Sequence, residues 1–132
     1  MSRQEKLTPA EWEIMEAVWE LGEAPSVRDV LERAFPKGEK AYTTVQTIMN
    51  TLERKGLLER RKIGLVNFYT PTRSREELVR AEMTALVSRV FDGSIPAFAN
   101  SLFSLDDLTL DEVRRIKKLI NSKERELGGG KK

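Results

Sequence analysis

Residues 41–71 read AYTTVQTIMNTLERKGLLERRKIGLVNFYTP, and this stretch decides the fold. Its first part has apolar residues three and four positions apart, which predicts a helix from about Thr43 to Lys55. Gly56 follows directly, and glycine is the usual residue just past the end of a helix. The four apolar positions expected to face the core are Val45, Ile48, Met49 and Leu52.

The second part of the stretch predicts a β-hairpin. Two runs with strand propensity, residues 57–62 and 65–69, flank Ile63-Gly64, and Pro71 closes the second run. A helix followed at once by such a hairpin indicates a winged helix-turn-helix, in which the hairpin is the wing. We therefore predict a mainly α protein with one small hairpin.

The segment before residue 41 predicts two further helices. Thr8 and Glu11 form a capping-box pattern around Pro9, and Gly22 ends the helix that they begin. Ser26, with an aspartate three residues later, begins a shorter helix. The first helix carries Trp12 and Trp19, which either stack on nucleic-acid bases or belong to the core; the helical spacing favours the core.

The polar face of the 43–55 helix is unusual for a surface that serves only solubility. It carries several threonines, which are poorer helix formers than glutamate or lysine. Threonine hydroxyls and methyls, together with carboxamides, are well suited to contacts with base edges in DNA. The predicted base-contacting residues are Thr43, Thr44, Gln46, Thr47 and Asn50. The alternative is a merely polar helix face.

Positive charge is concentrated in the same region. Residues 41–75 contain seven basic and two acidic side chains, whereas residues 1–40 contain six basic and nine acidic ones. A local excess of cations is what binding to a polyanion requires, although a solvated basic face gives the same pattern. The predicted contacts to the DNA backbone are Arg54, Lys55, Arg60, Arg61 and Lys62.

The C-terminal part of the chain predicts helices with more apolar surface than one copy can bury. Ser74 and Thr109 each begin a capping box, and apolar residues recur after both at helical spacing. Pairing of two copies would bury this surface; folding back onto the same chain is the alternative. The predicted dimer-interface residues are Val79, Met83, Leu86, Val90, Leu110, Val113, Ile116 and Ile120.

The amino-acid composition argues against several classes of function. The 132 residues include no cysteine and no histidine, which removes thiolate chemistry and the commonest general base and metal ligand. We find no phosphate-binding loop or nucleophile motif either, so we expect no enzyme, cofactor or metal site. No apolar run reaches the ~20 residues of a membrane span, and the N-terminus has no apolar signal region, so we expect a cytoplasmic protein.

The motifs together resemble the penicillinase and methicillin-resistance repressors (BlaI/MecI type). The resemblance runs from LTPAEWEIMEAVWELG through TTVQTIMNTLERKGLLERRKIGLVNFYTP to GSIPAFANSLFSLDDLTLDEV. It implies a dimeric repressor on a dyad-symmetric DNA operator, with base contacts from the start of the third helix and backbone contacts from the wing. It also implies a winged-helix domain at residues 1–73 and a helical dimerisation region at 74–127. The glycine-rich end of the sequence, residues 128–132, predicts a disordered tail.

The resemblance further implies a partner protease. The antibiotic-responsive members are inactivated by cleavage of an Asn-Phe bond in the dimerisation region. The aligned bond here is Ser101-Leu102, with Asn100 before it and Phe103 after it, so the pair itself is absent. The related copper-responsive repressors carry a C-terminal cysteine cluster, which this chain lacks.

Two other functions use the same elements. A winged helix can serve as a protein-interaction module without DNA, because a fold does not fix a function. A regulator that responds to a small ligand needs an apolar pocket with a few convergent polar groups, and the sequence does not locate such groups.

Overall fold

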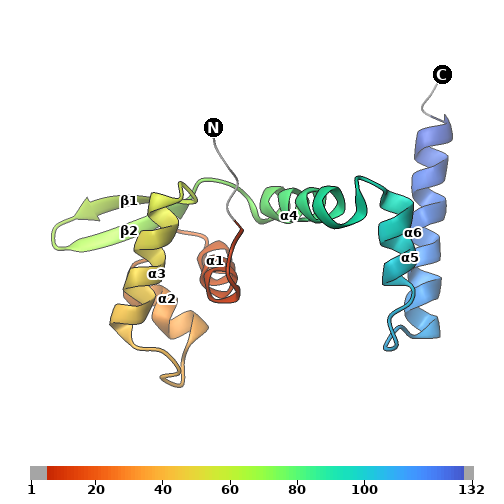
Figure 1. Ribbon diagram of the computed structural model, residues 1–132. Helices are drawn as coiled ribbons and strands as arrows, with labels where there is room; N and C mark the ends of the chain where they lie inside the picture. Colours follow the sequence, from red (N-terminus) through yellow and green to blue (C-terminus); the bar gives the residue numbers. More distant parts are fainter. Residues whose placement is uncertain (1–5, 130–132) are drawn as a thin grey trace. The chain divides into compact units, whose positions relative to one another are not determined.

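The computed structural model describes residues 6–129, which form two compact units that divide between Thr84 and Ala85. The sequence places a domain boundary after residue 73, whereas this division falls inside the helix α4, Arg75–Phe91. None of the helices between residues 6 and 129 combines the length and the apolar character that a membrane span requires. Figure 1 gives the order of the elements along the chain.

Two helices open the first unit. α1 spans Pro9–Leu21 and begins with the expected capping box, in which the Thr8 hydroxyl accepts from Glu11 N while the Glu11 carboxylate accepts from Thr8 N. α2 spans Val27–Ala34 and begins with an equivalent box between Ser26 and Asp29. Both helix starts confirm the sequence prediction.

The third helix, α3, spans Tyr42–Arg54 and follows α2 after a short connection. Its N-cap residue is Ala41, which offers no side-chain acceptor, so no side-chain cap precedes the threonines at its start. Two strands follow, β1 at Leu58–Ile63 and β2 at Val66–Pro71. The helix-turn-helix and its wing are therefore present in the expected order.

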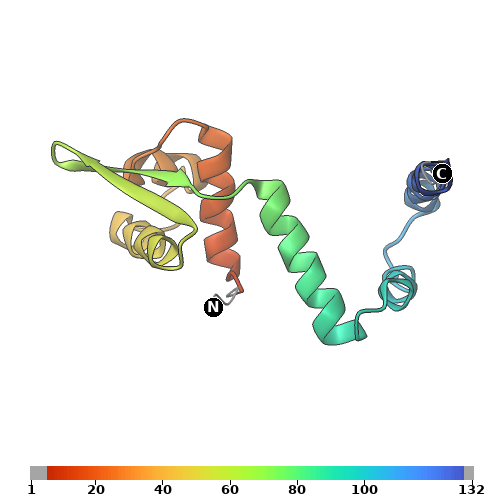
Figure 2. The same ribbon diagram turned by 90° about the horizontal axis from the view of Figure 1, so that it is seen from above.

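The turn of the hairpin lies one residue later than the sequence suggested. Leu58 pairs with Pro71 and Ile63 pairs with Val66, so the two-residue turn is Gly64-Leu65 in place of Ile63-Gly64. Gly64 has φ +65°, the left-handed value that a two-residue hairpin turn needs at its first position and that glycine adopts without strain. Figure 2 shows the hairpin extending beyond the three helices as an arm.

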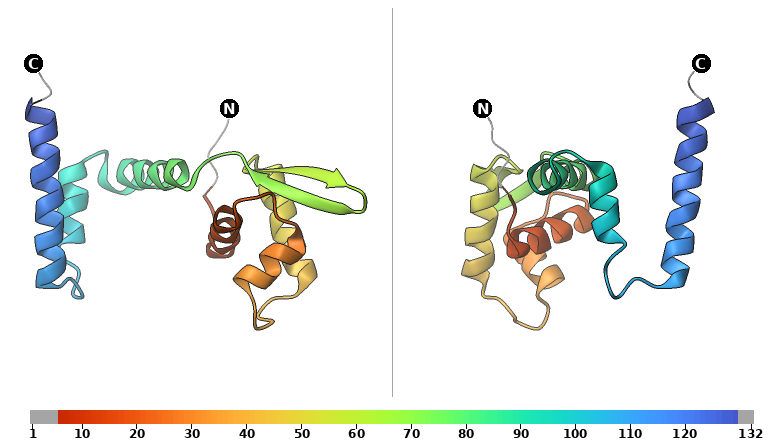
Figure 3. Two further views of the ribbon diagram at one scale, coloured as in Figure 1. Left: turned by 180° about the vertical axis from the view of Figure 1, so that it is seen from behind. Right: turned by 45° about the vertical axis from the view of Figure 1, so that its right-hand side comes forward.

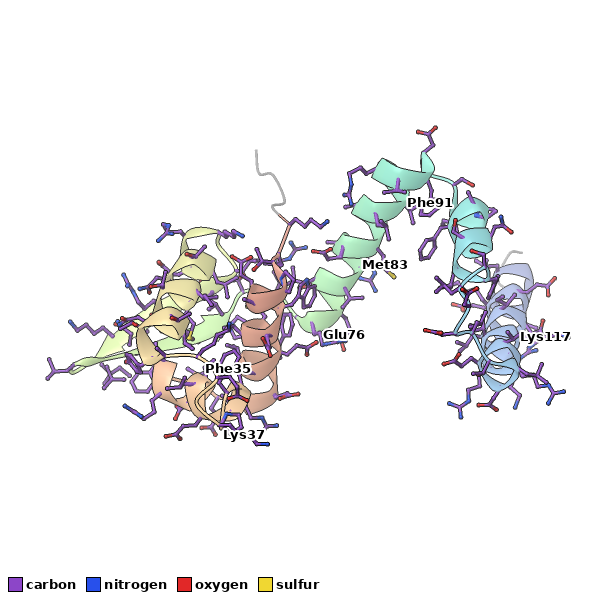
Figure 4. The ribbon with its side chains drawn as sticks, turned by 60° about the horizontal axis from the view of Figure 1, so that its bottom comes forward. Phe35, Lys37, Glu76, Met83, Phe91 and Lys117 are labelled. Atoms are coloured by element: carbon purple, nitrogen blue, oxygen red, sulfur yellow. The ribbon has the colours of Figure 1, made fainter. Side chains whose placement is uncertain are left out.

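The core of the first unit lies where the three helices meet the base of the hairpin. Ile14, Met15 and Val18 of α1 are buried there, and Phe35, labelled in Figure 4, closes the end of α2. From α3 the core takes Val45, Met49 and Leu52, with Ile48 partly buried against it, as expected from the sequence. Trp12 and Trp19 pack on this core with ring centroids 5.9 Å apart.

One residue of α4 also joins this core. Leu78 is buried, whereas the interface residues predicted on α4 are only partly covered. Val79 and Leu86 are half-buried, Met83 and Val90 are about half exposed, and Figure 4 shows Met83 projecting from the helix. The Arg75 guanidinium donates to the Glu16 carboxylate of α1 at 3.0 Å, and Trp19 Nε1 donates to Arg73 O at 3.0 Å. These contacts hold the start of α4 on α1.

The second unit is helical. α5 spans Ile95–Leu102 and α6 spans Leu110–Gly129, and the right-hand view of Figure 3 shows them as separate helices joined by the connecting segment. Thr109 and Glu112 form the expected capping box at the start of α6. The tail expected from residue 128 includes two glycines that belong to α6, and residues 130–132 lie outside the described part of the chain.

Candidate nucleic-acid interface

The threonine face of α3 is open to solvent. Thr43, Thr44 and Thr47 are exposed, and Gln46 is half-buried beside them. Val45, Met49 and Leu52, which project from the opposite side of the helix, are fully buried. α3 is therefore held from behind by the core and presents hydroxyls, methyls and one amide outward, the groups that meet base edges in a DNA groove.

Asn50 is placed differently from the other predicted base contacts. It is half-buried, and its Oδ1 accepts a hydrogen bond from the Tyr69 hydroxyl at 2.9 Å. Tyr69 comes from β2 and is fully buried. Asn50 thus connects α3 to the wing, so we assign it a positioning role in place of the base contact expected from the sequence.

The wing carries three exposed cations, and its register divides them between two faces. Arg60 lies opposite Tyr69 and Lys62 opposite Asn67, so both cations share the strand face that includes the buried Tyr69. Arg61 lies between them and points to the other face. Arg54, also exposed, ends the polar side of α3, where its guanidinium donates to Thr51 Oγ1 at 3.1 Å.

Lys55 departs from the sequence prediction. Its ammonium lies 2.9 and 3.0 Å from the two carboxylate oxygens of Glu11, and the two side chains are only 18% and 8% exposed. The pair joins the end of α3 to the start of α1. A lysine enclosed in this way is not positioned for a phosphate, so we remove Lys55 from the proposed backbone contacts.

Backbone hydrogen bonds fix the wing to the helices. Tyr69 N donates to Pro25 O at 2.9 Å, and Ser26 pairs with Phe68 as an isolated bridge on the free edge of β2. At the base of the hairpin, Thr72 Oγ1 donates to Gly56 O at 2.7 Å. The segment before α2 thus pairs with β2 at a single bridge, which holds the wing beside the start of α2.

Sequence reasoning missed two residues near this surface. The Arg28 guanidinium lies 5.6 Å from the centroid of the Tyr42 ring, and both side chains are exposed. They stand near the N-terminal ends of α2 and α3. The available signal was Tyr42 itself, a large aromatic residue directly before the first threonine of α3, where the apolar pattern does not require one.

In the second unit no described residue is buried. The predicted interface residues of α6 are exposed, except that Ile116 is half-buried in a shallow apolar hollow of about 430 Å³ formed with Leu105 and Leu108. α5 contacts the end of α4 through Phe91 and Phe98, whose ring centroids lie 5.6 Å apart. The single copy therefore leaves an apolar surface uncovered.

The proposed cleavage region lies at the end of α5. Ser101 and Leu102 are the last two residues of that helix, and Phe103 is its C-cap. Asn100, Ser101 and Phe103 are exposed, and Leu102 is half-buried. The segment after Phe103 has no regular structure until α6 begins at Leu110.

Comparison with protein families decides the class of this molecule. Residues 7–122 match the family model described as penicillinase repressor. The chain belongs to the penicillinase repressor family. It is therefore a DNA-binding transcriptional repressor with a winged-helix domain, and its family is not one of enzymes.

Curated relatives span most of the chain. The methicillin resistance regulatory protein MecI of Staphylococcus aureus (strain N315) is 20% identical over 118 residues, which cover 89% of this chain and 95% of that protein. The transcriptional regulator BlaI of Mycobacterium tuberculosis (strain CDC 1551 / Oshkosh) is 29% identical over 92 residues, 70% of this chain and 67% of that protein.

A solved structure supports the fold of the first unit. The solution structure of the DNA-binding domain of the repressor BlaI is 26% identical with a TM-score of 0.51, and it covers 58% of this chain and 93% of that domain. This similarity confirms the winged helix-turn-helix expected from residues 41–71.

Proposed function

We propose that this repressor is sequence-specific and acts as a homodimer on a dyad-symmetric DNA operator. The observation that carries the proposal is the exposed threonine face of α3, supported from behind by buried side chains and flanked by a cationic wing. Thr43, Thr44 and Thr47, with Gln46, supply the contacts to base edges in the major groove.

Backbone contacts supply most of the strength of binding. Arg60, Arg61 and Lys62 on the wing and Arg54 at the end of α3 are exposed cations on the same unit. Each phosphate that they neutralise releases condensed counterions, which makes the affinity fall with salt. These contacts fix the register of the protein on DNA, whereas the α3 side chains choose the sequence.

The second unit makes the protein dimeric in this proposal. Its exposed apolar residues on α4 and α6 are covered by a second copy, so that two winged helices meet two half-sites. Linking the half-sites raises the overall affinity by a factor of about 10²–10⁴. Loss of the dimer therefore releases the operator without change to any base contact.

In this proposal a regulatory protease causes the loss of the dimer. The end of α5, residues 100–103, is largely exposed and is followed by an irregular segment, so this stretch of chain is accessible to a protease. Cleavage there separates α6 from the DNA-binding unit. As a repressor that acts on DNA, the protein would work in the cytoplasm.

Selection of bound duplexes from a random pool, followed by titration of the selected duplex at several salt concentrations, tests the proposal. We expect one half-site repeated with dyad symmetry, and tight binding that weakens as salt rises. A scrambled duplex of the same length and composition is the control. Equal affinity for both duplexes contradicts sequence-specific repression, and absence of binding to either favours a protein-interaction module.

A further inference from the structure

A hollow of about 420 Å³ lies in the first unit beside the threonine face. Three elements form it: Arg28 comes from the start of α2, Tyr42 and Gln46 from the start of α3, and Leu65 and Asn67 from the turn and β2 of the wing. It therefore lies between the helix proposed to enter one DNA groove and the tip of the wing.

The polar side of the hollow presents a held cation. The Arg28 guanidinium lies over the Tyr42 ring at 5.6 Å, a cation–π contact that orients the planar group and leaves its N–H edge available. Its other partner is Glu32, 4.0 Å away, and both side chains of that pair are about two-thirds exposed. Such a pair contributes little, so it gives way to a phosphate, which accepts two parallel hydrogen bonds from arginine.

The opposite side of the hollow is apolar and faces water. Leu65 is 95% exposed at the turn of the wing, and its neighbours Ile63 and Val66 are about half exposed. Of these three residues, Leu65 and Val66 line the hollow, and their contact with water is unfavourable because the removal of apolar surface from water lowers the free energy. Their apolar surface suits the backbone of DNA, in which phosphates alternate with the apolar edges of sugars.

We propose that this hollow seats the sugar–phosphate strand of double-stranded DNA that separates the groove entered by α3 from the groove met by the wing. In this arrangement Arg28 bonds to one phosphate, and Leu65 packs on an adjacent deoxyribose. Tyr42 is a positioning residue, because it acts by holding the Arg28 guanidinium. The inference rests on the proposed function and adds to it a backbone contact centred on Arg28, Tyr42 and Leu65.

The salt dependence of affinity for the selected duplex tests the phosphate contact. Arg28→Gln should flatten the plot of log affinity against log salt by about one unit, the loss of one phosphate contact. Arg33→Gln is the matched control, since it removes the same charge from the same helix, where Arg33 pairs with Glu20 at 3.1 Å. An unchanged slope for Arg28→Gln, or equal changes in both variants, overturns the proposal.

Two further variants separate positioning from general charge. Tyr42→Ala should reproduce the flattened slope of Arg28→Gln, whereas Tyr42→Phe keeps the ring and should keep the wild-type slope. Leu65→Ser should weaken binding roughly threefold to tenfold with no change of slope, because it removes apolar contact and no charge. A wild-type slope for Tyr42→Ala, or wild-type affinity for Leu65→Ser, contradicts the respective contact.

The outcomes also separate this inference from the proposed function. If the wild-type protein binds no duplex in a salt-sensitive way, the proposed function fails and the hollow has no DNA strand to seat. If the wild-type protein binds its selected duplex and Arg28→Gln binds it with the same slope, repression by DNA binding stands and only the assignment of the hollow fails.

Discussion

The Tyr69 hydroxyl donates a hydrogen bond to Asn50 Oδ1 at 2.9 Å, and this bond joins the wing to the middle of α3. Tyr69 is fully buried, so water does not compete for the contact. Because α3 and the wing are proposed to contact DNA at the same time, the bond sets the relation between the two contacting surfaces. It also explains why an amide stands at position 50 among the threonines.

Tyr69→Phe should lower the free energy of unfolding by about 1–2 kcal/mol, because it removes one buried hydrogen bond and leaves the Asn50 oxygen without its donor. Urea denaturation measures the change. Tyr42→Phe is the control, since the Tyr42 hydroxyl is on an exposed residue. Equal stability of the two variants contradicts a structural role for the Tyr69–Asn50 bond.

Alkaline pH should weaken the fold through the same side chain. Burial raises the pKa of Tyr69 above its ordinary value of 10.0, against the opposing effect of the nearby Arg60 charge and hydrogen bond. The folded protein then holds the phenolic proton more tightly than the unfolded chain does. The resulting stability is complete below about pH 10 and is lost as the pH rises through the raised pKa.

Unfolding free energies of wild type and Tyr69→Phe, measured from neutral pH to about pH 11, isolate this effect. The difference between the two should be constant at neutral pH and should shrink above about pH 10, because only the wild type has this phenol to ionise. If the difference in unfolding free energy stays constant over the whole pH range, ionisation of Tyr69 does not contribute to the loss of stability at alkaline pH.

The ion pair between Glu11 and Lys55 leads to a prediction that separates stability from DNA binding. Lys55→Met leaves a nearly buried carboxylate without its cation and should lower the free energy of unfolding by about 3 kcal/mol. Glu11→Gln combined with Lys55→Met should recover part of that loss. In the folded protein the salt slope of DNA binding should stay at the wild-type value, whereas Arg54→Gln should flatten it. A flattened slope for Lys55→Met together with a wild-type slope for Arg54→Gln would show that Lys55, and not Arg54, contacts a phosphate.

Most of the fold was predictable because its signals are local. Thr8 with Glu11, Ser26 with Asp29 and Thr109 with Glu112 are capping pairs three residues apart, and each pair forms in the structure. The buried face of α3 follows from its spacing in the same way. These features need no knowledge of distant residues.

The departures involve partners that are distant in the chain. Lys55 meets Glu11 across 44 positions, and Asn50 meets Tyr69 across 19, so neither contact follows from local pattern. The turn is displaced by one residue because the register places Ile63 opposite Val66. The sequence-based prediction assigned Lys55 and Asn50 to DNA because it rested only on the charge of Lys55 and on the helix face that carries Asn50.

Thr47→Ala should relax preference at one base step, at a cost of about 1–3 kcal/mol in binding to the preferred duplex and little cost on others. Lys62→Gln should weaken all duplexes alike and flatten the salt slope by about one unit. Titrations of each variant against the selected duplex and single-base variants of it measure both effects. The controls are Thr84→Ala and Lys118→Gln, which change exposed residues outside the proposed DNA interface. Identical behaviour of Thr47→Ala and Lys62→Gln contradicts the proposed division of roles.

Ile120→Asp should convert the proposed dimer to a monomer, because it places a charge within the exposed apolar stripe of α6 that a second copy would cover. Sedimentation measures the change in mass. Affinity for the full dyad should fall by about 10²–10⁴, whereas affinity for a single half-site should not change. Ser122→Asp adds the same charge on the opposite side of α6 and is the control. A monomeric wild type, or a half-site affinity that falls together with that for the dyad, contradicts a switch that works through loss of the dimer.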